Sequence, residues 1–411
     1  MTAQGVRGEQ LLSGGERFGP EPGFFARLIA PGFGKILDRI DAGLERGSLI
    51  GHLPDGTTRM LGGRAPGFEA EVWLKDWRAL LRLATNGTIG WYQAYDAGEW
   101  DSNDMTAMFA VMSDNVRSLG GTARSSGPFR WAAALAHRFN RNDKAGSRRN
   151  IAAHYDLGND FYAAWLDPSM TYSSGLACGE DGLEAAQQLK LEAMAERVGN
   201  PGTVLEIGCG WGSMAEHLAQ RGAEVTAISL SDEQLAFARQ RRDRSIDFRK
   251  QDYRDVAGQF DAIVSVEMVE ALGREYWPAF MDCVASNLKP GGRAALQYIS
   301  IEDDLFETYA GTADFIQAYI FPGGLLIKSP EFRELVEKRG FNWEDETRFG
   351  PDYAETLRLW HERFETAVEQ GRLPDGFDDR FVRLWRYYLT YCEAGFRTGN
   401  IDVHQVTLVK Q

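Results

Sequence analysis

Short apolar runs alternate with amphipathic segments along the second half of the chain. From residue 187 to about 300, the runs of strand length are TVLEIGC, EVTAISL, FDAIVSV and RAALQYIS. Between them lie segments whose apolar residues recur at helical spacing, such as QQLKLEAMAERV and SMAEHLAQRG. Strands that alternate with helices predict a parallel sheet covered by helices.

The N-terminal part has a different pattern, typical of a small α+β unit. Residues 24–47 have near-helical apolar spacing that breaks at Pro31-Gly32. Residues 48–63 predict two strands joined by a turn at Pro54-Asp55-Gly56, and EAEVWLKDW continues the strand character. WRALLRLATNG predicts a short helix that stops at Gly87. This part contains no cluster of nucleophile, base and metal ligand, so we expect it to be non-catalytic.

A polar segment separates the two parts. Residues 138–149, RFNRNDKAGSRR, carry five basic residues against one Asp: Arg138, Arg141, Lys144, Arg148 and Arg149. The segment is either a solvated connector or a surface for anionic lipid head groups. We therefore expect a small domain over residues 1–137, a basic linker over 138–150 and a second domain over 151–411.

Composition and charge narrow the class of protein. A chain of 411 residues with 44% hydrophobic and 25% charged residues is expected to form two soluble globular domains. No apolar run reaches the roughly 18–20 residues of a membrane span, and no signal-peptide core is visible, so we expect a cytoplasmic protein. The net charge of −14 argues against a nucleic-acid partner.

The cysteine pattern argues against a metal site. The four cysteines, Cys178, Cys209, Cys283 and Cys392, are far apart and show no C-x-x-C spacing. Neither zinc nor a disulfide framework is expected, and no metal is assigned.

The strongest chemical signal is a glycine-rich turn. In VLEIGCGWG, an apolar strand runs into Gly208, Gly210 and Gly212, and a helix follows. Glycines permit close approach of a ligand to the backbone, and a helix N-terminus attracts anionic groups. The spacing differs from the G-x-G-x-x-G of dinucleotide sites, and Glu206 precedes it. This version suits a ligand with an ammonium and a carboxylate group, such as S-adenosylmethionine.

The next two strands offer further cofactor contacts. The second strand ends at Ser229-Leu230 without an acid to hold ribose hydroxyls, so Gln234, one turn into the following helix, is the expected substitute. Alternatively, Gln234 faces solvent. The third strand closes at Asp252-Tyr253, where a carboxylate would accept from an adenine amine, or else cap a helix.

Several separate segments give the chain a family resemblance. Over residues 150–410 it resembles the cyclopropane-fatty-acyl-phospholipid synthases and mycolic-acid methyltransferases. The segments are HYDLGNDFY (154–162), LDP (166–168), MTYS (170–173), EIGCGWG (206–212), SLS (229–231), QDYRD (251–255), YIFPGG (319–324), YYL (387–389), FR (396–397) and Gln405. The first 130 residues resemble the N-terminal domain of the bacterial synthases more loosely.

The resemblance implies a reaction. Family members transfer the methyl group of S-adenosylmethionine to a cis double bond of a phospholipid acyl chain, and a bound bicarbonate is taken to remove a proton from the resulting carbocation. By position, the bicarbonate ligands here are Ser174, Glu270, Gln297, Ile299 and Tyr353. The resemblance also implies Tyr172 and Ser173 as cofactor contacts.

This ligand set departs from the family pattern. Ser174 and Gln297 stand where the family has Cys and His, and Ala271 replaces the His that usually follows the Glu. Ser and Gln still donate hydrogen bonds to an anion. Gln297, however, does not take up a proton near neutral pH as a His does. The product is therefore either a cyclopropane or a methylene- or methyl-branched chain, and a non-catalytic lipid-binding protein is a third possibility.

Aromatic residues are the candidates for an acyl-chain tunnel, with core packing as the alternative. They are Tyr298, Tyr309, Phe315, Tyr319, Phe321, Trp360, Tyr387 and Tyr388.

Taken together, the sequence predicts a Rossmann-like class I methyltransferase sheet preceded by a small α+β N-terminal domain. The expected partner is an unsaturated phospholipid at the inner face of the membrane, to which the chain would be peripheral. The small domain would assist docking or dimer contact, since the resemblance implies a homodimer.

Overall fold

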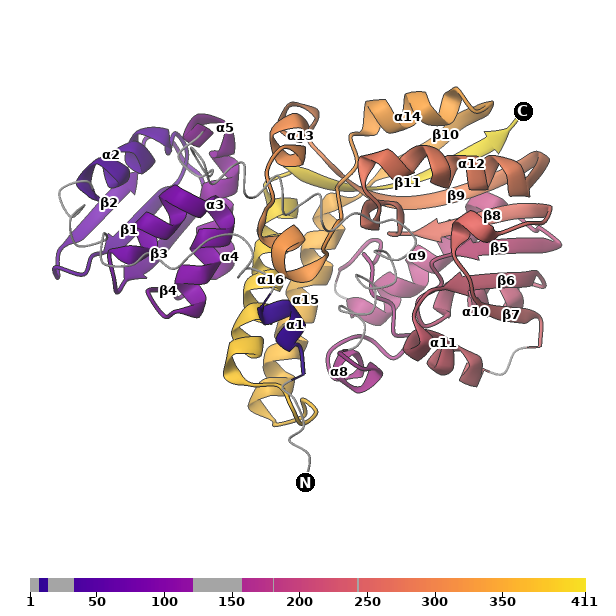
Figure 1. Cartoon of the computed structure of the whole chain (residues 1–411), viewed down its shortest axis with the longest axis horizontal. Coiled ribbons are helices and arrows are strands. Elements are labelled where there is room, and N and C mark those ends of the chain that lie inside the picture. The colour runs from indigo at the N-terminus through magenta and orange to yellow at the C-terminus, as the bar shows by residue number, and fades with distance from the viewer. Residues whose placement is uncertain (1–6, 14–32, 121–156, 180, 242–243) are drawn as a thin grey trace. The chain divides into compact units, whose positions relative to one another are not determined.

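The computed structural model describes residues 7–13, 33–120, 157–179, 181–241 and 244–411. The basic linker and the first residues of the HYDLGNDFY segment lie outside these ranges. The chain forms two compact units, shown in Figure 1. One comprises residues 1–140, 304–322 and 376–400, and the other comprises residues 141–303, 323–375 and 401–411.

The second unit is built on a seven-stranded sheet of order β10-β11-β9-β8-β5-β6-β7. Strands β7, β6, β5, β8 and β9 are parallel, whereas β11 pairs antiparallel with both β9 and β10. The predicted α/β sheet is confirmed. The strands are β5 (Thr203–Ile207), β6 (Glu224–Ser229), β7 (Ile246–Lys250), β8 (Phe260–Val266), β9 (Leu288–Ile301), β10 (Phe341–Arg348) and β11 (Ile401–Lys410).

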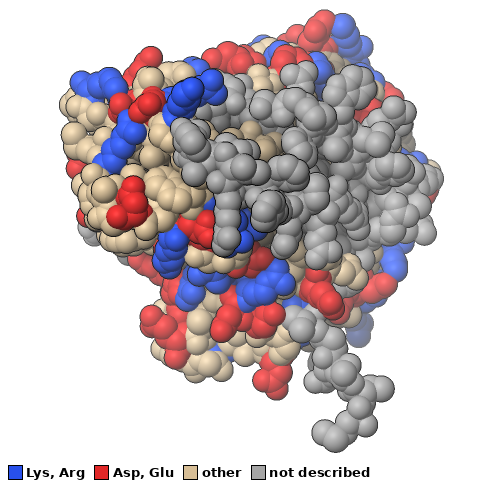
Figure 2. Space-filling model, turned by 60° about the vertical axis from the view of Figure 1, so that its left-hand side comes forward, with Lys and Arg blue, Asp and Glu red and all other residues tan. Residues whose placement is uncertain are grey.

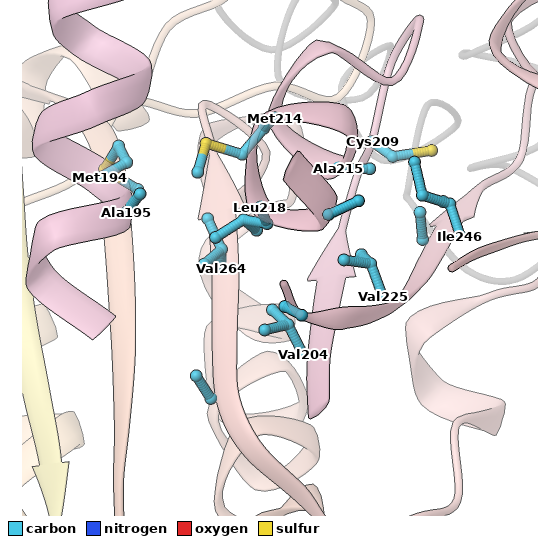
Figure 3. Close-up of a cluster of buried hydrophobic side chains, with 14 of the residues drawn as sticks. Met194, Ala195, Val204, Cys209, Met214, Ala215, Leu218, Val225, Ile246 and Val264 are labelled. Carbon is cyan, nitrogen blue, oxygen red and sulfur yellow. The ribbon is translucent and has the colours of Figure 1, made fainter. Parts of the chain in front are cut away.

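Helices cover this sheet. They are α8 (Asn159–Ala163), α9 (Gly182–Val198), α10 (Ser213–Gln220), α11 (Asp232–Ala238), α12 (Trp277–Asn287), α14 (Ser329–Glu337) and α15 (Gly350–Glu369). Short 3₁₀ turns join them: η4 (Arg239–Arg241), η5 (Tyr253–Asp255), η6 (Val269–Ala271) and η7 (Arg274–Tyr276). Figure 3 shows α9 and α10 packing over the strands, with Met194, Met214 and Leu218 against Val204 and Val264. This core fixes the ends of β5, β6 and β8, where the candidate site lies.

The first unit has a four-stranded sheet of order β2-β1-β3-β4. The hairpin predicted around Pro54-Asp55-Gly56 is present as β1 (Ser48–His52) and β2 (Thr58–Gly62), followed by β3 (Glu69–Leu74) and β4 (Trp100–Ser102). The helices are α1 (Glu9–Leu12), α2 (Phe33–Gly43), α3 (Arg78–Asp96), α4 (Met105–Asp114), α5 (Val116–Leu119), α13 (Asp303–Ala310), the π-helical turn η8 (Ile316–Ile320) and α16 (Asp379–Arg397).

The predicted break at Gly87 is confirmed. The range α3 spans two helical stretches, and Gly87 separates them with φ of 59° and ψ of −137°, which lie outside the helical region. Glycine adopts this conformation without a Cβ clash. The sequence did not predict the second stretch, which ends at Asp96 and whose residues Ile89, Tyr92 and Tyr95 are buried.

The described surface carries mixed charge. Acidic and basic side chains are interspersed on the face drawn in Figure 2. In the described residues, no helix is long and apolar enough to cross a membrane.

Candidate active site

The glycine turn between β5 and α10 needs glycine because of its backbone conformation. Gly208, Gly210 and Gly212 have φ of 85°, 51° and 86°, which L side chains rarely adopt. A Cβ at Gly208 would come within 2.8 Å of Met268 Cγ, and one at Gly212 within 2.9 Å of Phe248 Cζ. At Gly210 the nearest protein atom would be 4.0 Å away. Gly208 and Gly212 are therefore needed for packing, whereas Gly210 leaves open space above the turn.

Glu206, at the end of β5, lies buried behind this turn. Its Oε2 is buried and has no hydrogen-bond partner among the described residues, and burial raises the pKa of Glu206 to about 8. A buried cation, Lys190 of α9, opposes that shift, and burial lowers the pKa of Lys190 to about 8. An unsatisfied buried carboxylate oxygen beside a glycine turn fits a cationic ligand group.

The end of β6 positions Gln234. Ser231 caps α11, with the Gln234 backbone N–H donating to its hydroxyl at 3.2 Å. The Ser229 hydroxyl donates to Gln234 Oε1 at 3.1 Å, so the amide nitrogen is the end nearer Gly210. Gln234 is buried, not solvent-facing, while Leu230 is partly exposed.

At the end of β7, Asp252 is held by its own turn. Its Oδ1 accepts from the Arg254 backbone N–H at 3.0 Å and from Arg254 Nε at 2.8 Å. Its Oδ2 lies 2.6 Å from Arg254 Nη2. Asp252 therefore caps η5. Tyr253 is buried, and burial raises its pKa to about 12.

The segment before α9 contacts the cofactor turn. Trp211 Nε1 donates to Asn159 Oδ1 at 2.7 Å, and Asn159 Nδ2 donates to the Glu233 carbonyl at 3.1 Å. Thr171 Oγ1 donates to Ser213 Oγ at 3.0 Å. These bonds join α8 and the MTYS segment to the helices that follow β5 and β6.

Tyr172 and Ser173 belong to the same segment. The Tyr172 ring packs against Tyr162, at 5.4 Å between centroids, and against Trp360, at 5.3 Å. Ser173 Oγ accepts from Lys190 Nζ at 2.8 Å. Tyr172 thus packs against α8 and α15, and Ser173 is held against α9.

Three of the predicted anion ligands converge on one carboxylate that the sequence did not single out. The Ser174 backbone N–H donates to Glu267 Oε1 at 2.9 Å, and Gln297 Nε2 donates to the same oxygen at 2.7 Å. The Tyr353 hydroxyl donates to Glu267 Oε2 at 2.6 Å. Withdrawal from water raises the pKa of Glu267, and the three donors oppose that rise.

The other two predicted ligands pair with each other. The Ile299 backbone N–H donates to Glu270 Oε1 at 3.0 Å, while Glu270 Oε2 is buried and has no hydrogen-bond partner in the part of the chain that the structure describes. Desolvation, then the neighbouring Glu267 charge, raise the pKa of Glu270 well above its ordinary range. Glu267 and Glu270 thus form a pair of carboxyl groups in unlike environments.

Sequence reasoning missed Glu267, Lys190 and Asn159. Glu267 follows the apolar run FDAIVSV at the end of β8, where ligands of open α/β sheets bind. That position was a usable signal for Glu267. Lys190 occupies an ordinary helix pattern, and only its full burial distinguishes it.

Six of the eight candidate tunnel residues are buried, whereas Tyr309 and Phe321 are partly exposed, and the buried ones lie in separate clusters. Trp360 lies with Tyr172 in the second unit. In the first unit, Phe315, Tyr319 and Tyr387 pack around Tyr92 at centroid distances of 4.9, 4.4 and 5.1 Å. Core packing accounts for these contacts, so the acyl-chain role stays a prediction.

The sheet and its glycine turn define the class. The fold is shared with coclaurine N-methyltransferase, at a TM-score of 0.60 and 15% identity. It is also shared with the cyclopropane synthase MmaA2 from Mycobacterium tuberculosis, at a TM-score of 0.59 and 30% identity. Together with the site these likenesses assign the chain to the class I S-adenosylmethionine-dependent methyltransferases.

The family follows from the sequence match. The mycolic acid cyclopropane synthetase model matches residues 142–406, and the chain belongs to this family. The chain is 38% identical over 352 residues to the tuberculostearic acid methyltransferase of Mycobacterium tuberculosis, covering 80% of this chain and 81% of the relative. It is 34% identical over 358 residues to the cyclopropane-fatty-acyl-phospholipid synthase of Escherichia coli K12, covering 84% and 88%.

A solved relative contains the demethylated cofactor. Mycolic acid cyclopropane synthase CmaA1, complexed with SAH and CTAB, matches 64% of this chain and 98% of its own, at a TM-score of 0.60 and 30% identity. The chain is a lipid-modifying methyltransferase that uses S-adenosylmethionine.

Proposed function

We propose that this protein transfers the methyl group of S-adenosylmethionine to the cis double bond of an unsaturated phospholipid acyl chain. The observation that carries the proposal is a carboxylate cage, which consists of Glu267 and its donors Ser174, Gln297 and Tyr353. The cage lies next to the cofactor turn, because Met268, which follows Glu267, packs against Gly208. An alkene is a weak nucleophile, so its methylation creates a carbocation that a base must quench. The site supplies buried carboxyl groups for that purpose.

The residues of the turn fit S-adenosylmethionine. Bound there, it supplies an electrophilic methyl group on a sulfonium ion. The free oxygen of Glu206 would accept from the ammonium group, and the space over Gly210 would admit the main part of the ligand. Gln234 presents its amide nitrogen toward the same space, in the place proposed for ribose recognition. Tyr172 and Ser173 would border it.

Asp252 fits the adenine role less well than the sequence suggests. Both of its oxygens are engaged by Arg254, which leaves them available only as shared acceptors. We propose that Asp252 and Tyr253 shape the adenine side of the site, with Asp252 acting first as the cap of η5.

The residues present do not fit a bound bicarbonate. Ser174, Gln297 and Tyr353 donate to Glu267, and Ile299 donates to Glu270, so these donors already have protein acceptors. The Ser174 hydroxyl itself donates to the Gly175 carbonyl at 2.8 Å. No step is assigned to bicarbonate here.

A second product class is favoured by the altered ligand set. Ser174 and Gln297 in place of the expected Cys and His change how the proton is removed. The match to a tuberculostearic acid methyltransferase at 38% identity supports a methylene- or methyl-branched chain as strongly as the match to the Escherichia coli synthase supports a ring.

The lipid substrate supports a peripheral position at the membrane, with the first unit assisting docking or dimer contact. Flotation with vesicles and analytical ultracentrifugation would test these two proposals.

Analysis of cellular lipids tests the reaction. Cells that express the protein and contain oleoyl phospholipids are expected to accumulate acyl chains whose mass is greater by one CH₂ group. Fragmentation of the dimethyl disulfide adducts distinguishes the products, because a methylene chain retains an alkene and a cyclopropane does not. Unchanged acyl chains would refute the proposal.

A further inference from the structure

We infer that Glu267 is the catalytic base of this enzyme and that its side chain replaces a diffusible anion. The inference rests on the proposed function and names the group that completes it. Its basis is the geometry of the hydrogen bonds around Glu267 and the shape of the backbone that presents it.

The donors fix Glu267 as an acceptor. The Ser174 backbone N–H is only a donor, so Glu267 Oε1 must accept from it. The orientation of the Gln297 amide is set by two residues behind it, Gln405 and Arg197. Arg197 Nε, only a donor, lies 3.2 Å from Gln405 Oε1, and Gln405 Nε2 donates to Gln297 Oε1 at 3.0 Å.

This amide relay leaves Gln297 one orientation, with Nε2 toward Glu267 Oε1 at 2.7 Å. Two obligatory donors on one oxygen keep that oxygen free of a proton. Tyr353 reaches the other oxygen, and Lys190 adds a nearby positive charge. The cage therefore stabilises the carboxylate form of Glu267.

Glu270 takes the opposite role. Its carboxyl group accepts from the backbone N–H groups of Ile299 and of Glu270 itself, its Oε2 has no hydrogen-bond partner within the described ranges, and it faces the charge of Glu267. Like charges this close do not both ionise readily, so the proton stays on Glu270 while Glu267 remains ionised. Two adjacent carboxyl groups are thereby divided into a base and a neutral neighbour.

The backbone at Glu267 is strained. Glu267 has φ of 47°, one of four described non-glycine residues at positive φ. Such a conformation is unfavourable for a residue with a Cβ and persists where surrounding structure imposes it. Ser174, Gln297 and Tyr353 are buried, and the Glu267 carboxylate is buried among them. The strained backbone and the buried donors together hold the carboxylate in one position, one residue before Met268, which packs against Gly208.

The proposed reaction is a methyl transfer followed by the loss of one proton. The alkene π pair bonds to the methyl carbon as the carbon–sulfur bond breaks and its pair stays on sulfur, which gives S-adenosylhomocysteine and a carbocation. Glu267 takes one proton from the transferred methyl group. The released C–H pair either closes the ring directly or, after a hydride shift that moves the cation to the methyl-bearing carbon, forms the C=CH₂ double bond of a methylene branch. The proton leaves to water before the next turnover.

Chemical rescue tests this assignment in the full-length protein. Glu267→Gly removes the carboxylate and suits the positive φ, so the variant is expected to fold and to bind S-adenosylhomocysteine as the wild type does. Turnover on dioleoyl phosphatidylglycerol vesicles in bicarbonate-free buffer is expected to fall by about 100-fold or more. Added bicarbonate or formate, which fit the vacated cage, should restore part of it.

Controls separate the possible failures. Wild-type turnover is expected to be the same with and without bicarbonate, and Glu334→Gln, on an exposed carboxylate, should leave it unchanged. An active wild type that stops when bicarbonate is removed, or a fully active Glu267→Gly, would overturn the assignment alone. A wild type that binds S-adenosylhomocysteine but modifies no unsaturated lipid would overturn the proposed function and the assignment with it.

Discussion

At the scale of single residues, a comparison of two glycines distinguishes the effect of a side chain on backbone strain from its effect on cofactor binding. Gly210 and Gly222 have φ of 51° and 96°, and a Cβ at either meets no protein atom closer than 4.0 Å. Only Gly210 belongs to the cofactor turn. An alanine at either position thus introduces backbone strain, but only one occupies ligand space.

We predict that Gly210→Ala and Gly222→Ala each lower the free energy of unfolding by about 1–2 kcal/mol, since both force an L residue into left-handed backbone. Gly210→Ala should in addition weaken S-adenosylhomocysteine binding by about 10-fold or more, because its methyl group enters the site. Urea unfolding and calorimetric titration measure the two effects. Equal affinities for both variants would show that the turn does not hold the cofactor.

A comparison of the carboxyl groups shows which site residues a sequence pattern predicts and which it does not. Glu206 and the glycines were identifiable because a strand, a turn and a helix follow in one short segment. The position of Glu267 at the end of a strand was a signal for a ligand site, but its donors were not identifiable, because they come from residues 174, 297 and 353, which are far apart in sequence. Only the fold brings them together.

At the scale of elements, α8 is the helix that connects the MTYS segment to the cofactor turn. Asn159 accepts from Trp211 Nε1 and donates to the Glu233 carbonyl, and so joins α8 to residues before α10 and within α11. No periodic pattern predicts these bonds, although the strands and helices of the sheet were predictable from apolar spacing.

We predict that Asn159→Ala weakens S-adenosylhomocysteine binding several-fold, because the Trp211 indole loses its acceptor and the turn loses support. Ala163→Ser, at an exposed position of the same helix, is the matched control and should bind as the wild type does. Fluorescence or calorimetric titration gives both constants. Unaltered binding by Asn159→Ala would mean that α8 has no part in the site.

The range α3 shows what a local signal predicts and what it leaves out. The glycine signal predicts a break at Gly87, and the backbone leaves the helical region there. The second helical stretch, which ends at Asp96, was not predicted, because it depends on the tertiary packing of its buried residues.

At the scale of the whole molecule, the buried carboxyl groups of the site lower the free energy of unfolding by an amount that depends on pH. Burial raises the pKa of Glu206 to about 8, and the pKa of Glu267 and of Glu270 is raised as well. Below the ordinary carboxyl pKa, the folded and unfolded states are both protonated. As pH rises from there to about 8, the unfolded chain releases protons that the folded chain retains.

We therefore predict that the free energy of unfolding of the wild type falls as pH rises from about 5 to about 8. Glu206→Gln should flatten part of this decline, since its amide does not titrate, whereas Glu334→Gln should preserve the wild-type profile. Urea unfolding across this range is the measurement. A profile that Glu206→Gln leaves unchanged would contradict the assigned burial of that carboxyl.

The arrangement of the two units was only partly predictable. A small α+β unit with its hairpin and a larger α/β unit follow from the change of pattern near the basic linker. Residues 304–322 and 376–400 also belong to the first unit. The sequence does not predict this membership, because their helical patterns resemble those of their neighbours.

The central claim is that this chain alkylates an acyl double bond with its own carboxylate as base. The most direct measurement uses purified protein, trideuteromethyl S-adenosylmethionine and dioleoyl phosphatidylglycerol vesicles in bicarbonate-free buffer, with mass spectrometry of the acyl chains. The account predicts acyl chains that have gained one carbon carrying only two of the three deuterium atoms, because Glu267 removes the third. Acyl chains without deuterium, from protein that binds S-adenosylhomocysteine, would contradict it.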